Sequence, residues 1–244
     1  MPKKSKSGLA RALSKMGYCS RAQATALIRG GRVKLNGREV RNPEAPVRMG
    51  VDHLTVDGSA IAERPKLYLM MNKPRGLVTT ASDEKGRATV YDLLDSGKER
   101  EWVSPVGRLD KASEGLLLLT NDSKWAARIT DPARHLDKRY DVQVDCVVGN
   151  VLLERIKAGA TVGGELLRAK AVRILRVGSK NSWLEITLDE GRNRQIRRLI
   201  EALGAQVLRL VRVSVGALEL GELKKGAVRH LTEAEKRSVG AGTR

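Results

Sequence analysis

Apolar and polar positions alternate in a regular way through the first sixty residues. Apolar residues recur every three or four positions over 9–16, which predicts a helix that ends at Gly17. Ser20 is placed to cap a second helix that the Gly30-Gly31 pair stops. The Asn36-Gly37 pair between two short apolar runs predicts a hairpin, and 51–58 alternates like one more strand. The pattern therefore predicts a small module of two helices and a short sheet over residues 8–58.

A larger domain is expected over residues 67–237, after a polar linker at 59–66 that contains Pro65. Its apolar runs and alternating segments predict strands at 67–73, 115–120, 138–145, 170–177, 182–190 and 207–215. Helical patterns fall at 123–131, 150–159 and 193–204, and a further short helix is expected near 89–95. A Thr232–Glu235 capping box predicts a last short helix near the C-terminal end. Strands and helices mix without a regular βαβ alternation, which favours an α+β fold with a largely antiparallel mixed sheet. Residues 1–7 and 238–244 are expected to be disordered tails.

The charge of the chain points to a polyanionic partner. The formal net charge is +18 over 244 residues. Residues 1–58 hold twelve Lys and Arg against four Asp and Glu, a net charge of +8. A positive field of this size favours nucleic acid, although a solvated basic surface without a partner stays an alternative.

Cysteine and histidine are too sparse to indicate a metal site. Cys19 and Cys146 are single and far apart, and the three histidines show no ligand spacing. No apolar run approaches the roughly 20 residues that span a bilayer, and the first residues lack the apolar centre of a signal peptide. We therefore expect no metal, no membrane segment and a reduced, cytoplasmic location.

Residues 20–40, SRAQATALIRGGRVKLNGREV, resemble the S4 RNA-binding domain. The first helix fits that family less closely, because the acidic residue that usually follows an opening Arg-Leu in the family is missing here. An S4 helix pair presents cations to phosphates and reads RNA shape more than sequence. The resemblance implies RNA contacts by five side chains: Arg11, Arg21, Arg29, Arg32 and Lys34.

Three polar segments of the larger domain carry candidate chemistry. They are GRLD at 107–110, KRY at 138–140 and EGRNRQIRR at 190–198. Taken singly, each has a structural alternative. Asp110 could accept backbone hydrogen bonds in its own turn, Tyr140 could be an ordinary strand residue, and the arginines could form a solvated, phosphate-facing helix.

Together with LMMNKPRG at 69–76 and RLVRVSVG at 209–216, these segments resemble the pseudouridine synthases, in the branch that carries an N-terminal S4 domain and modifies ribosomal RNA. The resemblance covers about residues 8–232. It implies that Asp110 is the catalytic carboxylate, acting as a nucleophile or by proton abstraction. Tyr140 would stack on the flipped base, and Arg197 would keep Asp110 ionised and oriented. Arg108 would fill the space that the base vacates.

Other residues receive more general roles from the resemblance. Arg192 and Arg194 are expected at the RNA, and Lys73 either contacts phosphate or has a structural role at the end of its strand. No cofactor is expected, because the isomerisation is redox-neutral. The expected partner is ribosomal RNA, free or in an assembling subunit, and the protein is expected to be a monomer.

Two rival functions remain at this point. A non-catalytic S4-type RNA-binding protein in ribosome assembly would explain the charge equally well. A nuclease or glycosylase is the second rival, against which the lack of metal ligands and of a second carboxylate near Asp110 weighs. The sequence leaves open which uridine, and which subunit RNA, would be modified.

Overall fold

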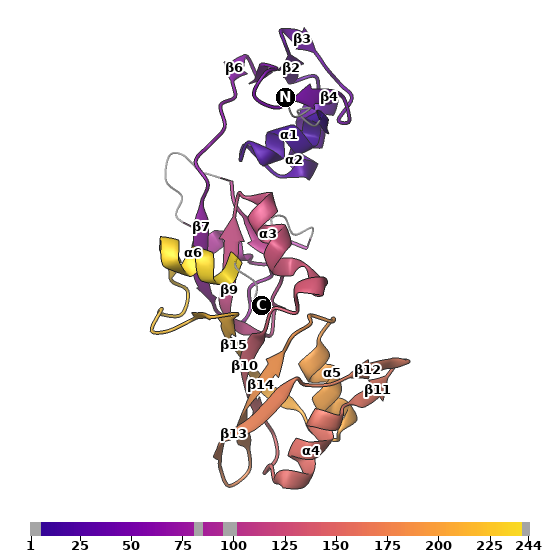
Figure 1. Cartoon of the computed structure of the whole chain (residues 1–244), viewed down its shortest axis with the longest axis vertical. Coiled ribbons are helices and arrows are strands. Elements are labelled where there is room, and N and C mark those ends of the chain that lie inside the picture. The colour runs from indigo at the N-terminus through magenta and orange to yellow at the C-terminus, as the bar shows by residue number, and fades with distance from the viewer. Residues whose placement is uncertain (1–5, 81–84, 95–101, 241–244) are drawn as a thin grey trace. The chain divides into compact units, whose positions relative to one another are not determined.

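The computed structural model describes residues 6–80, 85–94 and 102–240, and the chain divides into two compact units. The first unit comprises residues 1–68 with 95–104 and 119–124. The second comprises residues 69–94, 105–118 and 125–244. Figure 1 shows the elements of each unit along the chain.

The first unit contains the predicted helix pair, α1 (Leu9–Lys15) and α2 (Arg21–Arg29). Ser20 caps α2 through a capping box with Gln23, as the sequence predicts for its side chain. The strands of this unit are β1 (Lys6–Gly8), β2 (Val33–Leu35), β3 (Arg38–Glu39), β4 (Pro46–Arg48), β5 (Leu54–Val56) and β6 (Ser59–Ala60). Four of them form a sheet in the order β3-β2-β5-β6, and β1 pairs with β4 in a second, two-stranded sheet. The apolar faces of both helices and of the strands form one core, which includes Leu13, Ile28 and Val33.

The ends of the expected segments differ from the structure in detail. Lys6 and Ser7 were expected in a tail but lie in β1, where Ser7 is paired with Val47 and buried. Ser59 and Ala60 were expected in a linker but pair with β5. The last helix, α6 (Glu233–Gly240), continues past residue 237. The remaining tail residues, 1–5 and 241–244, lie outside the described residues.

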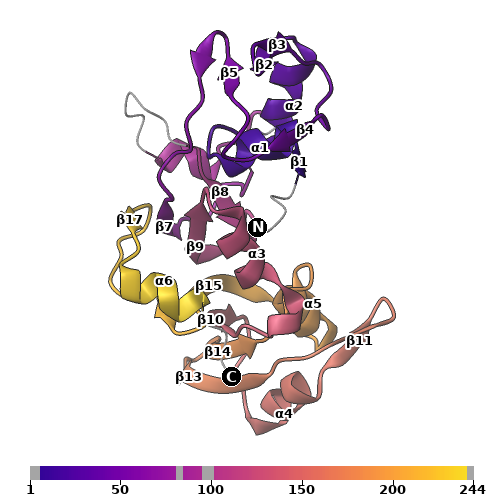
Figure 2. The ribbon, with the colours of Figure 1, turned by 45° about the horizontal axis from the view of Figure 1, so that its top comes forward.

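The larger sheet has nine strands and is mixed. Its order is β13-β14-β10-β15-β9-β7-β17, with β16 beside β15 and β8 beside β9. Figure 2 shows β13, β14, β10 and β15 side by side; these four strands are antiparallel in succession, whereas β15 and β9 are parallel. The strand bounds are β7 (Tyr68–Lys73), β8 (Ser104–Val106), β9 (Glu114–Thr120), β10 (Lys138–Val144), β13 (Ala171–Val177), β14 (Ser182–Leu188), β15 (Val207–Val215), β16 (Leu218–Glu219) and β17 (Val228–His230). The predicted α+β class and largely antiparallel sheet are confirmed.

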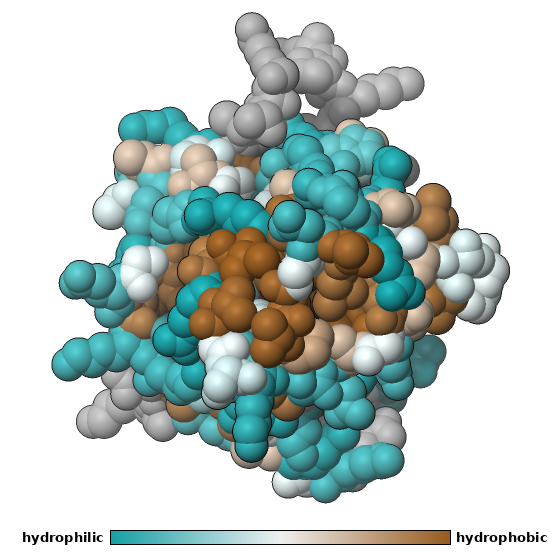
Figure 3. All heavy atoms as spheres, turned by 90° about the horizontal axis from the view of Figure 1, so that it is seen from below, coloured by the Kyte–Doolittle hydropathy of each residue, from teal (hydrophilic) through white to brown (hydrophobic). Residues whose placement is uncertain are grey.

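Helices and one hairpin complete the second unit. They are η1 (Val90–Leu93), α3 (Ser123–Thr130), η2 (Pro132–Arg134), α4 (Asn150–Ala158), the hairpin of β11 (Ala160–Val162) and β12 (Glu165–Leu167), α5 (Gln195–Ala202) and α6. The helix α5 lies beside the β11–β12 hairpin (Figure 1). Exposed apolar side chains of this unit include Val147, Val151 and Val177, and Figure 3 shows apolar side chains gathered on the face seen from below.

The parallel contact between β9 and β15 is short and depends on a glycine. It consists of two residue pairs, Val211 with Glu114 and Arg212 with Gly115. A Cβ at Gly115 would lie 2.3 Å from the carbonyl oxygen of Arg212, and the φ of Gly115 is +100°. The carbonyl of Leu116, the next residue on β9, accepts a hydrogen bond from Nε of Arg212 at 2.7 Å. Only glycine lets the two strands approach here and then separate.

Candidate active site

A cavity of about 340 Å³ in the second unit brings parts of all three polar segments together. Its walls come from the GRLD turn, the start of β10, the loop before α5, and the facing parts of β9 and β15. The polar side chains that line it include Arg108, Asp110, Ser113, Asp131, Lys138, Tyr140, Asp189, Glu190, Arg192, Arg194 and Arg212.

The backbone around Asp110 is held in place while its carboxylate is left open to the cavity. The carbonyl of Asp110 accepts hydrogen bonds from N of Ser113 at 2.9 Å and from Nζ of Lys73 at 3.2 Å. Thr79 holds the preceding residue, because its Oγ1 donates to the carbonyl of Leu109 at 2.7 Å. Among the described residues, none donates a hydrogen bond to the Asp110 carboxylate. The alternative in which this side chain caps its own turn is therefore not what the structure shows.

Lys73 takes the structural role that the sequence left as one of two options. Its side chain is 0% exposed, and Nζ donates to the carbonyls of Pro74, Asp110 and Ser113 at 3.1, 3.2 and 2.9 Å. Burial lowers the pKa of Lys73 to about 8, although the charges of Asp110 and Glu114 act in the opposite direction. A phosphate contact by Lys73 is wrong for this structure, because no part of the side chain reaches solvent.

Tyr140 stands on the floor of the cavity, in β10. Its residue is 9% exposed, and its cross-strand neighbours are Ile186 on β14 and Arg212 on β15. Lys138, two residues earlier on the same strand, also lines the cavity, as expected for side chains that alternate between the faces of a sheet. The tyrosine ring is thus one wall of a space that also contains the Asp110 carboxylate.

Arg197 contacts the Asp110 turn through its backbone and not through the carboxylate. From α5, Nη2 of Arg197 donates to the carbonyl of Ala112 and Nη1 to that of Val207, each at 3.0 Å. No hydrogen bond or ion pair joins Arg197 to Asp110, both of which the structure describes, and Arg197 is not among the residues that line the cavity. Burial lowers the pKa of Arg197, the charge of Arg194 acts the same way, and Asp110 raises it. The expected direct partnership is therefore replaced by support of the turn from behind.

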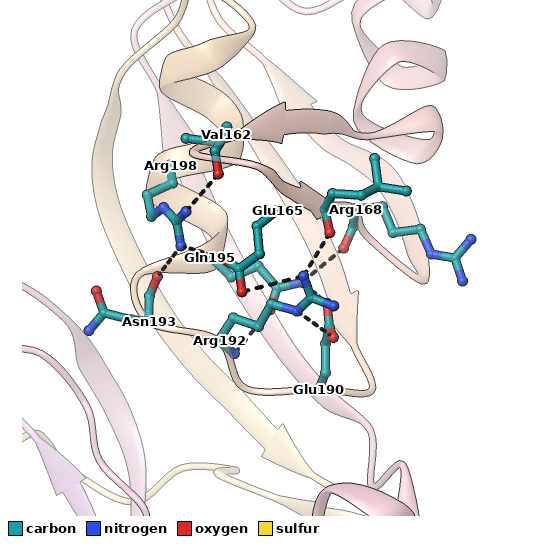
Figure 4. A network of polar contacts seen from close by, with 9 residues as sticks. Val162, Glu165, Arg168, Glu190, Arg192, Asn193, Gln195 and Arg198 are labelled. Carbon is teal, nitrogen blue, oxygen red and sulfur yellow. Dashed lines mark hydrogen bonds and ion pairs between the residues drawn. The ribbon is translucent and has the colours of Figure 1, made fainter.

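Figure 4 shows how the loop before α5 is fixed. Nε of Arg192 donates to Glu190 at 2.9 Å, and Nη1 donates to the carbonyl of Leu166 at 3.0 Å. Arg198 binds Glu165 at 2.9 Å, so both arginines tie the loop and the helix to the β11–β12 hairpin. Arg192 is thus committed to this network, which argues against the RNA contact expected for it.

Arg194 and Arg108 differ from Arg192 in being unpaired. Arg194 precedes α5 in a left-handed backbone conformation with φ of 48°, and Arg108 follows Gly107, whose φ is +74°. Both side chains are exposed and line the cavity, and in the described part of the chain neither has an ion pair or a hydrogen bond. Both are therefore free to contact a polyanion at the cavity mouth.

The cations expected in the first unit fall into two groups. Arg11, Arg21, Arg29 and Lys34 are exposed, and no described residue forms an ion pair with any of them. Arg32 is exposed too, but it binds Asp57, with Nε at 2.8 Å from Oδ1.

Comparisons with known proteins place the chain in a family. The sequence model described as RNA pseudouridylate synthase matches residues 67–202, and the S4 domain matches residues 8–52. The chain belongs to the RNA pseudouridylate synthase family. It is 40% identical over 91% of its length to an uncharacterized RNA pseudouridine synthase of Aquifex aeolicus, 89% of which is covered. It is 36% identical over 96% of its length to the ribosomal large subunit pseudouridine synthase B of Bacillus subtilis, 95% of which is covered.

A solved structure agrees with this placement. The crystal structure of a pseudouridylate synthase superposes with a TM-score of 0.67 and 30% identity, covering 95% of this chain and 99% of that one. This member of the RNA pseudouridylate synthase family is accordingly an isomerase with an N-terminal S4 domain.

The cavity residues of this pseudouridylate synthase that the sequence reasoning missed include two cations, Lys138 and Arg212. Both are cations at positions of an alternating strand that face inward, whereas the neighbouring inward positions Val142 and Leu210 are apolar. A lysine or arginine at an inward-facing position of an alternating strand is the sequence signal that would have identified them. Within the described residues, no group of three or more His, Cys, Asp or Glu side chains could hold a metal ion, and no helix is long and apolar enough to cross a membrane.

Proposed function

We propose that this protein isomerises a specific uridine of ribosomal RNA to pseudouridine, with Asp110 as the catalytic carboxylate. The observation that carries the proposal is the open carboxylate of Asp110, which shares a cavity with Tyr140 while its backbone is fixed by Lys73 and Ser113. The ribosomal substrate is supported by the name of the Bacillus subtilis relative, a ribosomal large subunit pseudouridine synthase.

The reaction asks little of the protein beyond one carboxylate and a closed space. The N1–C1′ bond of uridine breaks, the uracil turns without leaving, and a bond forms from C5 to C1′. C5 loses its proton and N1 gains one, so the product is an isomer of uridine. Asp110 acts in this sequence either as a nucleophile at the sugar or by proton abstraction. Because the base stays bound, no second carboxylate is needed to activate water, in contrast to glycoside hydrolysis.

Tyr140 and Arg108 are assigned to handling the base. The target base must leave its stack to enter the cavity, which costs a few kcal/mol. The Tyr140 ring offers a face on which the uracil stacks, and the exposed Arg108 at the mouth fills the space that the base vacates.

The other cations are assigned to position and binding. Arg197 supports the turn of Asp110 through the carbonyl of Ala112. This rigidity matters because a displacement of a catalytic group by about 1 Å can lower the rate about 100-fold. Arg194 and the unpaired cations of the S4 domain, Arg11, Arg21, Arg29 and Lys34, are assigned to phosphates of the RNA.

The test is a pseudouridine map of unmodified large- and small-subunit ribosomal RNA after incubation with the protein. We expect one new pseudouridine, absent with Asp110→Asn and present with the control Glu154→Gln, which changes an exposed carboxylate of α4. RNA affinity should be nearly unchanged in Asp110→Asn. A proportional loss of binding and chemistry in this variant would contradict the catalytic assignment. Intact RNA without pseudouridine would favour the non-catalytic alternative, and abasic or shortened RNA would favour a glycosylase or nuclease.

A further inference from the structure

Two cations on neighbouring strands share the cavity with Tyr140. Lys138 and Tyr140 lie two residues apart on β10, so their side chains point to the same face of the sheet. Arg212 on β15 is the cross-strand partner of Tyr140. All three residues line the cavity.

The guanidinium of Arg212 is buried without a counter-charge. The residue is 5% exposed, and its one hydrogen bond runs from Nε to the carbonyl of Leu116 at 2.7 Å. Among the described residues no carboxylate pairs with it, and its two η nitrogens have no partner. Both η nitrogens are accessible to solvent, since neither is a fully buried atom without a partner. The open end of this side chain therefore faces the cavity.

Lys138 is the second cation of the pair. Its Nζ donates to the carbonyl of Leu136 at 2.8 Å, and no described carboxylate forms an ion pair with it. The adjacent Asp137 is instead bound by Lys170 at 2.7 Å. Burial lowers the pKa of Lys138, and the positive charge of Arg212 lowers it further, whereas Asp137 and Asp189 raise it. The two cations are therefore near enough to repel each other.

This pair and the catalytic carboxylate are carried by different elements of the cavity wall. Lys138 lies in β10 and Arg212 in β15, whereas Asp110 lies in the turn before β9. The charge of Asp110 acts on Lys73 and Arg197, whereas the carboxylates that act on Lys138 are Asp137 and Asp189.

We propose that Lys138 and Arg212 bind a phosphodiester group of the RNA directly beside the target uridine. Buried cations are costly unless an anion with good hydrogen-bond geometry accompanies them. Asp137 and Asp189 are near enough to act on Lys138, but no described carboxylate forms an ion pair with Lys138 or Arg212. A phosphodiester brings a full negative charge and two free oxygens, which match the paired N–H groups of a guanidinium. A phosphodiester compensates one of the two positive charges, whereas a neutral uracil carbonyl would compensate neither.

The subsite rests on the proposed function, because it assumes that the cavity receives a uridine nucleotide. Its role is to fix the phosphate in the cavity so that the attached ribose stands over Asp110. Lys138 and Arg212 are then positioning residues for the reaction and contact the RNA backbone, not the atoms whose bonds change.

The first test combines a variant with a chemical change in the RNA. Short RNAs that contain the mapped uridine are made with a neutral methylphosphonate in place of the phosphodiester on its 5′ or 3′ side. We expect one replacement to lower kcat/KM of the unaltered protein about ten-fold or more, the effect of losing a charged hydrogen bond. The same replacement should have a clearly smaller effect in Lys138→Met, because one of the two cations that bind the phosphate is already absent. Lys157→Met, an exposed change in α4, should respond to the methylphosphonate like the unaltered protein.

The outcomes separate the subsite from the reaction. If the unmodified RNA is converted and neither methylphosphonate matters, or if Lys138→Met stays as sensitive as the unaltered protein, the subsite is refuted while the proposed function stands. If unmodified RNA is not converted at all, the proposed function fails, and the second test decides on the subsite.

The second test needs no turnover. Reductive methylation of Lys138 is followed by mass spectrometry in the presence of uridine 3′,5′-bisphosphate or of uridine, with Lys157 as the internal reference. We expect the bisphosphate to slow the modification of Lys138 several-fold and uridine to leave it unchanged. Equal protection by both would show that these cations contact the nucleoside, and no protection by the bisphosphate would show that they bind no phosphate; either result overturns the proposal.

Discussion

Replacing Lys73 by methionine tests whether a buried charge fixes the Asp110 turn. The substitution keeps the length of the side chain and removes the ammonium group. It leaves the carbonyls of Pro74, Asp110 and Ser113 without this donor, and a buried group that loses its partner costs about 1–3 kcal/mol. It also removes the cost of burying a charge. Because burial moves the pKa of Lys73 from 10.5 to about 8, that cost is about 3 kcal/mol at pH 7. The two effects oppose each other, but more than one carbonyl loses its donor, so the variant should be less stable than the unaltered protein at pH 7.

The unfolding free energies of the unaltered protein and of Lys73→Met should diverge as the pH rises. The folded pKa of Lys73 is depressed, so between pH 8 and 10.5 the unfolded chain binds more protons than the folded one. The unfolding free energy of the unaltered protein then increases with pH, by about 3 kcal/mol over this window, through this one group. Lys73→Met lacks this ammonium group, so its unfolding free energy should not show this increase with pH. At pH 7 its turnover should nevertheless fall about ten-fold to 100-fold, because the Asp110 turn has lost an anchor.

The assay is urea denaturation of both proteins from pH 7 to pH 10, with pseudouridine formation measured at pH 7. The difference between the two unfolding free energies cancels the other groups that titrate in this range. Lys157→Met, the same substitution at an exposed lysine of α4, serves as the control. A pH-independent difference for Lys73→Met would refute the reasoning, because it would mean that Lys73 is not buried as a charged group. Unchanged turnover would refute its role at the turn.

Three further changes test other parts of the structure. Gly115→Ala should lower the unfolding free energy in urea denaturation by about 3 kcal/mol or more, because the new Cβ would lie 2.3 Å from the carbonyl oxygen of Arg212 and the backbone has a positive φ. The control Gly149→Ala has open space around it and should change the unfolding free energy by less than about 1 kcal/mol. Arg194→Ala should reduce the slope of log affinity against log salt by about one without a change in melting temperature, whereas Arg192→Ala should lower the melting temperature because it breaks the network with Glu190. Replacing all four unpaired cations of the S4 domain, which are Arg11, Arg21, Arg29 and Lys34, should reduce the slope of log affinity against log salt by up to about four. An unchanged slope would show that this surface does not contact RNA.

The sequence by itself determined most helices and the longer strands, the S4 domain and the segments that carry the chemistry, but not the short strands β8, β11, β12, β16 and β17. Helix caps, glycine stops and the Asn36-Gly37 turn are signals among consecutive residues, and local geometry follows from them directly. The same holds for the alternation that defines β10 and β15. The segments around Asp110 and Tyr140 were recognised together, and the structure places both residues in one cavity.

Only the tertiary structure decided what each cation does. Lys73 is buried because β7 ends against the carbonyls of Asp110 and Ser113, about forty residues away. Arg197 supports a carbonyl and not a carboxylate, and Arg192 is held by a hairpin that lies before it in the chain. Lys138 and Arg212 line one cavity because β10 pairs with β15, and a register shift in this ladder places Arg212 opposite Tyr140. An arginine or lysine has the same charge in every setting, so its role is set by partners distant in sequence, which periodicity and local motifs do not encode.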